Sequence, residues 1–139
     1  MINIFKITII SLCSLLLYSN HAHAERYTNI SNKQLTQLMK NGVQVYDIRR
    51  PEEWKQTGVI PGARLMTYQD ANGNLMPGFF ERFTKEIPKD KPVVLICRTG
   101  NRTSKLAYAL HSQYGYSRVY NLQRGIRQWI NDGYGTEKQ

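Results

Sequence analysis

Hydrophobic residues recur at helical spacing in some stretches and as short unbroken runs in others, and the two patterns alternate along the chain. Leu35, Leu38 and Met39 follow a candidate N-cap, Ser31, at the spacing of one helix face. Residues 93–96 form instead a continuous run of β-prone apolar residues. The full pattern predicts strands at 43–48, 64–67, 93–96 and 118–122, and helices at 31–42, 51–58, 77–86, 103–114 and about 126–130.

Strands that alternate with helices favour an α/β fold, in which a mostly parallel sheet is covered by helices on both faces. The run at 93–96 is the best candidate for the central strand, because it is apolar on both faces. Ligands of such sheets bind beyond the carboxyl ends of the strands, and Cys97 lies at this end of the run. Residues 25–29 and 135–139 show neither pattern and are expected to be loose ends.

The first 24 residues have the organisation of a secretory signal peptide. A single cation, Lys6, precedes a mostly apolar run at 7–18, and a small-residue A-H-A pattern follows at 22–24. The apolar run is shorter than the roughly 20 residues that a membrane-spanning helix needs. An uncleaved anchor and a lipid-modified Cys13 are the less favoured alternatives. Cleavage after the A-H-A pattern predicts an exported single domain, residues 25–139, without a membrane anchor.

Basic residues outnumber acidic ones, and their distribution limits what the charge can do. Without the first 24 residues the chain keeps 18 basic and 10 acidic residues, a balance of +8. The cations are scattered rather than gathered in a run, and export is predicted, so nucleic acid is not an expected partner. The excess is either a solvated basic surface or an attraction for small anions and acidic partners.

Cysteine and histidine are too few for a disulfide or a metal site in the predicted mature domain. Cys97 is its only cysteine, so it is either a buried inert thiol or a free reactive one. His111 is its only histidine and is expected on the surface of a helix. A metal site needs three or four converging ligands, so we expect no metal, and nothing in the sequence calls for a cofactor.

The residues after Cys97 suit a reactive thiol better than an inert one. A thiol becomes a strong nucleophile as the thiolate, which nearby positive charge and backbone amides favour. Arg98 and Arg102 supply fixed charge, and Gly100 permits a turn that brings the amides of 98–102 toward the sulfur. The helix expected from Thr103 would add its positive end. The alternative is a buried strand end followed by surface arginines.

Four segments carry patterns that occur together in one family. They are D-I-R-R-P-E-E-W at 47–54, G-V-I-P-G-A at 58–63, C-R-T-G-N-R-T-S at 97–104 and L-Q-R-G-I-R-Q-W at 122–129. In this order and spacing they resemble the rhodanese-like domain family, in particular the single-domain rhodaneses exported to the bacterial periplasm. Each segment alone is a weak to moderate signal, but all four in order are a strong one, and the resemblance runs from about Tyr46 to Tyr134, most of the chain after the predicted signal.

The resemblance implies a five-stranded parallel sheet and a sulfurtransferase reaction. Cys97 would take a sulfane sulfur from an anionic donor such as thiosulfate, become a persulfide, and pass the sulfur to cyanide or a thiol, including a protein thiol. Asp47 and Arg49 would shape the rim of the site by ion pairing or hydrogen bonding. The residues expected to bind the donor or order the loop are Arg98, Thr99, Gly100, Asn101, Arg102 and Thr103. We expect a periplasmic monomer.

Two positions depart from the family's pattern. Val59 replaces the histidine of the G-H-I-P-G-A turn, where no chemistry is expected. Arg124 replaces the first glycine of the L-x-G-G pattern. Because its strand should end near the active loop, Arg124 is expected to add a cation beside the pocket.

Two other functions share the fold or the loop. Phosphatases and arsenate reductases of this architecture use a C-x5-R loop, but the sixth residue after Cys97 is Thr103 and the arginine stands at the fifth. The loop is therefore one residue too short to wrap a phosphate in that way. A non-enzymatic persulfide carrier or redox sensor needs the same loop as a sulfurtransferase, and only turnover separates the two.

Overall fold

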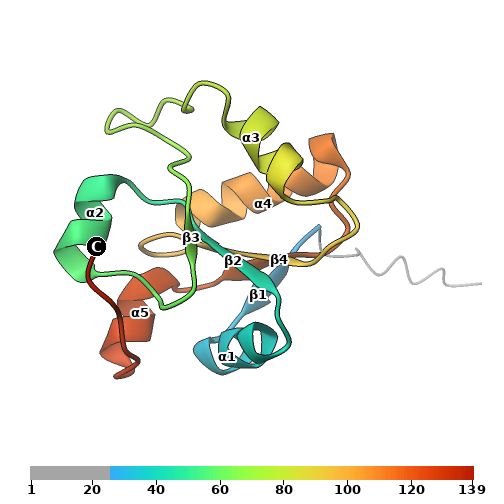
Figure 1. The fold of residues 1–139 in the computed structure, drawn as a ribbon. Coiled ribbons are helices and arrows are strands. Elements are labelled where there is room, and N and C mark those ends of the chain that lie inside the picture. Colours follow the sequence, from blue (N-terminus) through green and yellow to red (C-terminus); the bar gives the residue numbers. More distant parts are fainter. Residues whose placement is uncertain (1–25) are drawn as a thin grey trace, which may run out of the picture.

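The computed structural model describes residues 26–139 as a five-stranded sheet with helices on both faces (Figure 1). The predicted signal peptide at 1–24 and its cleavage site lie outside the described residues. The strands are β1 (Thr28–Ile30), β2 (Gln44–Asp47), β3 (Arg64–Leu65), β4 (Val93–Ile96) and β5 (Val119–Leu122). The helices are α1 (Asn32–Lys40), α2 (Pro51–Thr57), α3 (Phe79–Glu86), α4 (Asn101–Tyr114) and α5 (Gly125–Asn131). Among the helices described, none is long and apolar enough to cross a membrane.

All neighbouring strands run parallel, in the order β1-β5-β4-β2-β3, which confirms the predicted architecture. β4 lies between β2 and β5, and all four of its residues are buried. The prediction of a central strand at 93–96 is therefore confirmed. Because the strands are parallel, the residues that follow β2, β4 and β5 come together at one edge of the sheet, and Cys97 is among them.

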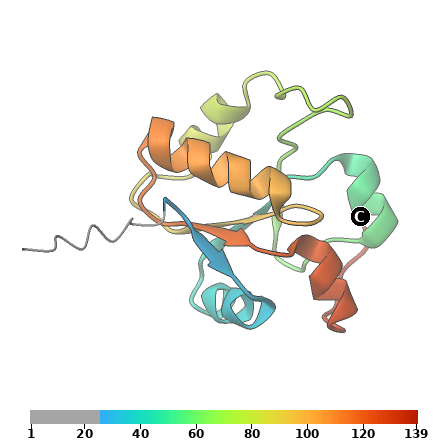
Figure 2. The same cartoon turned by 180° about the vertical axis from the view of Figure 1, so that it is seen from behind.

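The sheet is covered by α3 and α4 on one face and by α1 and α5 on the other (Figures 1 and 2). Phe79 and Phe83 of α3 pack in the core of the first face, and Leu35 of α1 and Trp129 of α5 pack in the core of the second. α2 buries none of its residues fully and lies at the side of the sheet. From this position α2 can contribute side chains to the carboxyl edge, the edge of the sheet at which the parallel strands end.

Helix ends follow the local signals of the sequence. Ser31 caps α1, because its Oγ accepts a hydrogen bond from the Gln34 amide while the Gln34 side chain accepts one from the Ser31 amide. Gly58 ends α2 and Gly115 ends α4, both with positive φ, as expected of glycine after a helix. These ends agree with the predicted ones.

Both ends of the described chain are attached to the fold, so the prediction of loose ends was wrong for residues 28–29 and 135–137, while Glu25 lies outside the described residues. β1 pairs along its whole length with β5 as an edge strand. Only Ile30 of β1 is buried, so the strand has no alternating pattern that the sequence could reveal. Near the C-terminus, Val59 and Glu137 exchange two backbone hydrogen bonds of 2.9 Å, which tie the tail to the turn after α2.

Candidate active site

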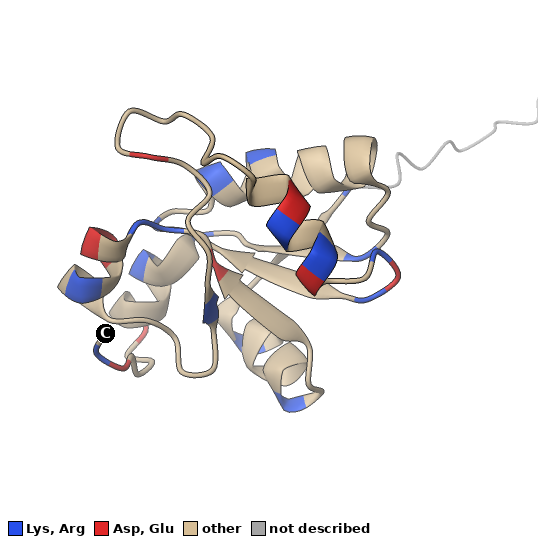
Figure 3. Ribbon diagram, turned by 45° about the horizontal axis from the view of Figure 1, so that its top comes forward, with Lys and Arg blue, Asp and Glu red and all other residues tan. Residues whose placement is uncertain are grey.

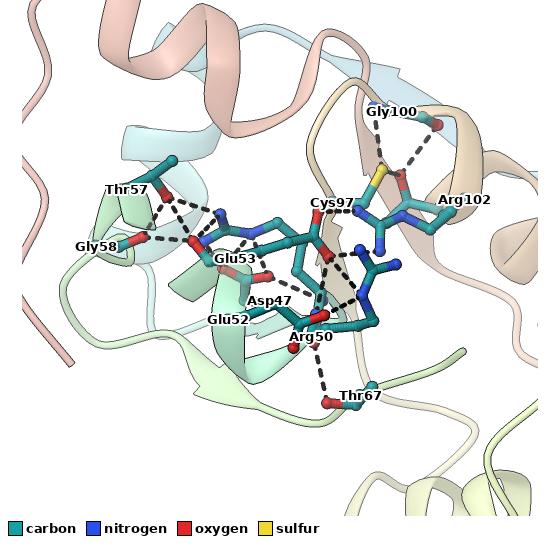
Figure 4. A network of polar contacts seen from close by, with 12 residues as sticks. Asp47, Arg50, Glu52, Glu53, Thr57, Gly58, Thr67, Cys97, Gly100 and Arg102 are labelled. Carbon is teal, nitrogen blue, oxygen red and sulfur yellow. Dashed lines mark hydrogen bonds and ion pairs between the residues drawn. The ribbon is translucent and has the colours of Figure 1, made fainter. Parts of the chain in front are cut away.

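The sulfur of Cys97 lies beneath the loop that joins β4 to α4 (Figure 4). The residue is only 1% exposed. The amide of Gly100 donates a hydrogen bond to Sγ at 3.1 Å, and Oγ1 of Thr103 lies 3.3 Å from Sγ. A thiolate accepts hydrogen bonds from both groups, so this surrounding suits an anionic sulfur.

α4 begins at Asn101, two residues earlier than the predicted start at Thr103. The reason is Gly100, which takes a left-handed conformation with φ of +91° and turns the chain directly into the helix. The earlier start places the Thr103 hydroxyl in the first turn, where it faces back toward the sulfur. Of the loop amides expected to converge on Sγ, the structure gives a hydrogen bond from that of Gly100.

The carbonyl of Gly100 is held by two buried side chains. Thr103 Oγ1 donates to it at 3.0 Å, and Nδ2 of Asn121 donates at 3.3 Å. Asn121 belongs to β5, is 2% exposed, and also donates to the side chain of Asn29 at 2.9 Å. The sequence analysis missed this residue, although one amide within an otherwise apolar buried strand was an available signal.

The start of α5 packs directly on the backbone of the active loop. Ile126 donates its amide hydrogen to the Cys97 carbonyl at 2.9 Å, and Arg127 donates to the Arg98 carbonyl at 3.2 Å. A Cβ atom on Gly125 would lie only 2.4 Å from the Arg98 carbonyl group. Gly125 is therefore required for this close approach, whereas its neighbour Arg124 is exposed and carries no such constraint.

Arg102 is directed toward α2 rather than standing free. Its guanidinium donates to both carboxylate oxygens of Glu53, at 2.8 and 2.6 Å (Figure 4). Burial raises the pKa of Glu53, but the hydrogen bonds from Arg102 and the Arg50 amide, with the charge of Arg102, outweigh it and hold the pKa at about 2. Sequence reasoning missed Glu53 as a partner of the loop.

Asp47 and Arg49 form a fully buried ion pair at the end of β2. Nε and Nη2 of Arg49 donate to the Asp47 carboxylate, with the shortest contact at 2.7 Å. The guanidinium also donates to Oγ1 of Thr57 and to the carbonyls of Glu53 and Gly58. These contacts join the end of β2 to α2 and to Gly58, which follows it; the role of the pair in shaping the rim of the site stays a prediction.

Two shallow hollows meet at Thr99 on the outside of the loop. The first, here called the loop hollow, has a volume of about 260 Å³ and is lined by Arg50, Glu53, Arg98, Thr99, Asn101 and Arg102. The second, here called the side hollow, has a volume of about 230 Å³ and is lined by Thr99, Arg124, Arg127 and Gln128. The expected position of Arg124 beside the active loop agrees with this geometry.

Charged residues of both signs are spread over helices and loops of the fold (Figure 3). Within residues 26–139, no three His, Cys, Asp or Glu side chains gather as a metal site would require. His111 is half-buried on α4, and its Nδ1 lies 3.0 Å from the Tyr116 carbonyl.

Comparison with known sequences agrees with this geometry. Residues 31–132 match the family model described as rhodanese-like domain. A sulfurtransferase from Allochromatium vinosum is 38% identical over 106 residues, which cover 75% of this chain and 89% of that protein. The thiosulfate sulfurtransferase GlpE from Pseudomonas aeruginosa is 32% identical over 106 residues, which cover 76% of this chain and 86% of that protein.

Solved structures give the same fold. A rhodanese-related protein from Thermoplasma volcanium matches with a TM-score of 0.60 at 29% identity, covering 78% of this chain and 96% of that one. The polysulfide-sulfur transferase homodimer from Wolinella succinogenes matches with a TM-score of 0.63 at 21% identity, covering 82% of this chain and 80% of that one. At 21% identity the second likeness concerns the fold alone.

Proposed function

Because the chain belongs to the rhodanese-like domain family, we propose that it is a sulfurtransferase that carries a sulfane sulfur on Cys97. Its relatives support sulfurtransferase activity in general. The observation that carries the proposal for this chain is the position of Sγ at the end of β4, against the Gly100 amide and the Thr103 hydroxyl. The donor is a small anion such as thiosulfate, and the acceptor is cyanide or a thiol.

Loading of the thiol is a displacement at sulfur. The Cys97 thiolate attacks the outer sulfur of thiosulfate, a new S–S bond forms, and the old S–S bond breaks with its electron pair leaving on sulfite. One thiolate and one dianion give one persulfide anion and one sulfite dianion, so charge and atoms balance. The Gly100 amide and Thr103 hydroxyl that face Sγ are fixed before the reaction, which is the condition for electrostatic preorganisation.

Unloading is a second displacement at sulfur, in which the Cys97 thiolate is the leaving group. The nucleophilic acceptor attacks the outer sulfur of the persulfide, and the bond to Sγ breaks with its electron pair returning to Cys97. With cyanide the product is thiocyanate, and with a thiolate it is a new persulfide. No net oxidant or reductant is consumed, so the cycle requires no redox partner.

The cations around the loop favour anionic donors and leaving groups. Arg98 is exposed and forms no ion pair with any acidic residue described by the structure. Arg102 is neutralised by Glu53, so its first role is to fix the loop against α2. Attraction of a donor from solution thus depends on Arg98 more than on Arg102, and it weakens as salt is added.

The loop length argues against the phosphatase alternative. Arg102 stands at the fifth position after Cys97 and is engaged by Glu53 in a bidentate ion pair. Its loop is one residue shorter than the C-x5-R loop that wraps around a phosphate. Hydrolysis of p-nitrophenyl phosphate at a rate near that of sulfur transfer would reverse this ranking.

The test is mass spectrometry of the protein after thiosulfate and then after cyanide or a thiol. Wild type should gain one sulfur atom and lose it to the acceptor, and Cys97→Ser should gain none. No gain on wild type, or an equal gain on the variant, contradicts the mechanism. Multiple turnovers under steady-state conditions separate an enzyme from a persulfide carrier, which would unload only once.

We also propose that the chain acts after export to the periplasm. The cation, apolar run and A-H-A pattern of the first 24 residues support this proposal. N-terminal sequencing of the protein recovered from a periplasmic fraction tests it, and a start at Glu25 is the expected result. Recovery of the full-length chain in the cytoplasmic fraction would contradict it.

A further inference from the structure

The side hollow contains two arginines, Arg124 and Arg127, to which the proposed reaction gives no role. Arg124 and Arg127 are both exposed, and neither forms an ion pair with an acidic residue of the described chain. By contrast, two arginines of the neighbouring loop hollow are paired, Arg50 with Glu52 and Arg102 with Glu53. The two free guanidinium groups of the side hollow therefore remain available to an anion from solution.

The side hollow is fixed relative to the reacting sulfur. Backbone hydrogen bonds join Ile126 to the Cys97 carbonyl and Arg127 to the Arg98 carbonyl, at 2.9 and 3.2 Å. Gly125 packs so closely on Arg98 that a Cβ atom would overlap it. The backbone of Arg124 and Arg127 is therefore held beside the active loop, while their exposed side chains extend from it. The shared wall at Thr99 places the side hollow next to the loop hollow.

The volume of the side hollow limits its occupant. At about 230 Å³ it is smaller than the roughly 300–1,000 Å³ of pockets that enclose whole drug-sized molecules. It suits one anionic group, and guanidinium forks match the two oxygens of a carboxylate. Thr99 and Gln128 are uncharged, and Nε2 of Gln128 donates to Asp132 at 2.6 Å, so the positive charge of the side hollow comes from the two arginines.

We propose that the side hollow binds the carboxylate of a small thiol acceptor while the thiol reacts at Cys97. The inference rests on the proposed sulfur transfer and names the class of acceptor. The acceptor's thiolate attacks the outer sulfur of the Cys97 persulfide, and the electron pair of the broken S–S bond returns to Sγ. The acceptor leaves as a persulfide that still carries its carboxylate, so atoms and charges balance.

A matched pair of acceptors tests the proposal. The two thiols 3-mercaptopropionate and 3-mercaptopropanol differ only in the carboxylate. Sulfur loss from persulfide-loaded protein is measured against the concentration of each thiol at low ionic strength. In Arg124→Gln/Arg127→Gln the half-saturating concentration of 3-mercaptopropionate should rise about tenfold, the scale of one charge-assisted contact, while that of 3-mercaptopropanol stays within about twofold.

Arg82→Gln is the matched control, because Arg82 is an exposed cation on α3, outside both hollows. It should change neither acceptor. An equal loss with both thiols in the double variant, or no loss with either, overturns the proposal. A cysteine-containing peptide rich in acidic residues is measured as a third acceptor. If the double variant weakens the reaction with this peptide alone, the proposal is also overturned, since that result assigns the arginines to a protein partner.

Binding without transfer separates this inference from the proposed function. Propionate has the carboxylate but no thiol, and it is titrated into nitrogen-labelled wild type and into the double variant. The Nε–H signals of Arg124 and Arg127 should shift and saturate, while the Arg82 signal does not. This result supports carboxylate binding in the side hollow even if Cys97 loads no sulfur. Shifts that never saturate, or that follow Arg82, count against the side hollow even if transfer is observed.

Discussion

Arg102 and Glu53 are joined by two hydrogen bonds of 2.8 and 2.6 Å, although 49 positions separate them in the sequence. The pair fastens the first turn of α4 to α2 and closes one side of the active loop. Arg102, which the sequence predicts to bind the anionic donor or order the loop, therefore primarily joins α4 to α2. Among the arginines that line the two hollows, those without an ion pair to an acidic residue of the described chain are Arg98, Arg124 and Arg127.

The first prediction is a pH-dependent contribution of the Arg102–Glu53 pair to stability. The pKa of Glu53 is depressed to about 2, so the pair contributes fully above the ordinary carboxyl range and is lost as the pH falls through about 2. Glu53→Gln should lower the free energy of unfolding by about 1–2 kcal/mol near neutral pH, after allowance for solvent screening. Chemical denaturation between neutral pH and pH 2 should show the two proteins converging.

Glu52→Gln is the control for this prediction, because Glu52 is an exposed residue of the same helix. Its ion pair with Arg50 is exposed to solvent and screened, so Glu52→Gln should change the unfolding free energy much less than Glu53→Gln. A difference between Glu53→Gln and wild type that persists undiminished at the lowest pH would mean that lost packing, rather than lost charge, destabilises the variant.

The second prediction concerns the buried pair of Asp47 and Arg49. Arg49→Met leaves the Asp47 carboxylate buried without its partner, so the free energy of unfolding should fall by about 3–5 kcal/mol. Asp47→Leu/Arg49→Met removes both charges and should cost less than the single change. Urea denaturation of the three proteins measures both differences. A double variant less stable than Arg49→Met would show that the hydrogen bonds to α2 matter more than the isolated charge.

The strand, loop and helix around Cys97 could be predicted because their signals are local. An unbroken apolar run precedes the cysteine, and Gly100 and the helical spacing of α4 follow within a few residues. The partners of that segment could not be predicted in the same way. Glu53 and Asn121 reach the loop from α2 and β5, and only the three-dimensional arrangement brings them there.

β1 shows a second limit of sequence reasoning. It is three residues long, pairs only with β5, and buries a single side chain, Ile30. Such a strand is stabilised by backbone hydrogen bonds, which leave no mark in the hydrophobic pattern. The four predicted strands, by contrast, each place apolar residues against one of the two cores or beside them. The fifth strand was expected from the family resemblance, which implied a five-stranded sheet, rather than from any residue of β1.

The third prediction separates two costs of replacing a glycine. Gly62 and Gly100 both have positive φ, +83° and +91°, but a Cβ on Gly62 meets nothing within 4 Å. A Cβ on Gly100 would lie 2.1 Å from the Gln123 carbonyl oxygen. Gly62→Ala should cost about 1–2 kcal/mol for the backbone conformation alone. Gly100→Ala should cost clearly more and should also slow the alkylation of Cys97, whereas equal costs would mean that the loop shifts freely.

The last prediction concerns the Thr103 hydroxyl, which has one hydrogen and two acceptors, the Gly100 carbonyl at 3.0 Å and the Cys97 sulfur at 3.3 Å. When the sulfur is a thiol, the S–H group can donate to Oγ1 while the hydroxyl donates to the carbonyl. When the sulfur is a thiolate, the hydroxyl can rotate and donate to Sγ, because Asn121 still holds the carbonyl. The hydroxyl therefore favours the thiolate without leaving Gly100 unpaired.

Thr103→Val keeps the shape of the side chain and removes this donor. The rate of Cys97 alkylation by iodoacetamide near neutral pH should fall about tenfold, less than the loss of a full oxyanion-hole donor because the bond to sulfur is longer. Thr103→Ser, which keeps the hydroxyl, should restore the rate. If serine fails to restore it, Thr103 acts through the shape of its side chain rather than through its hydroxyl donor.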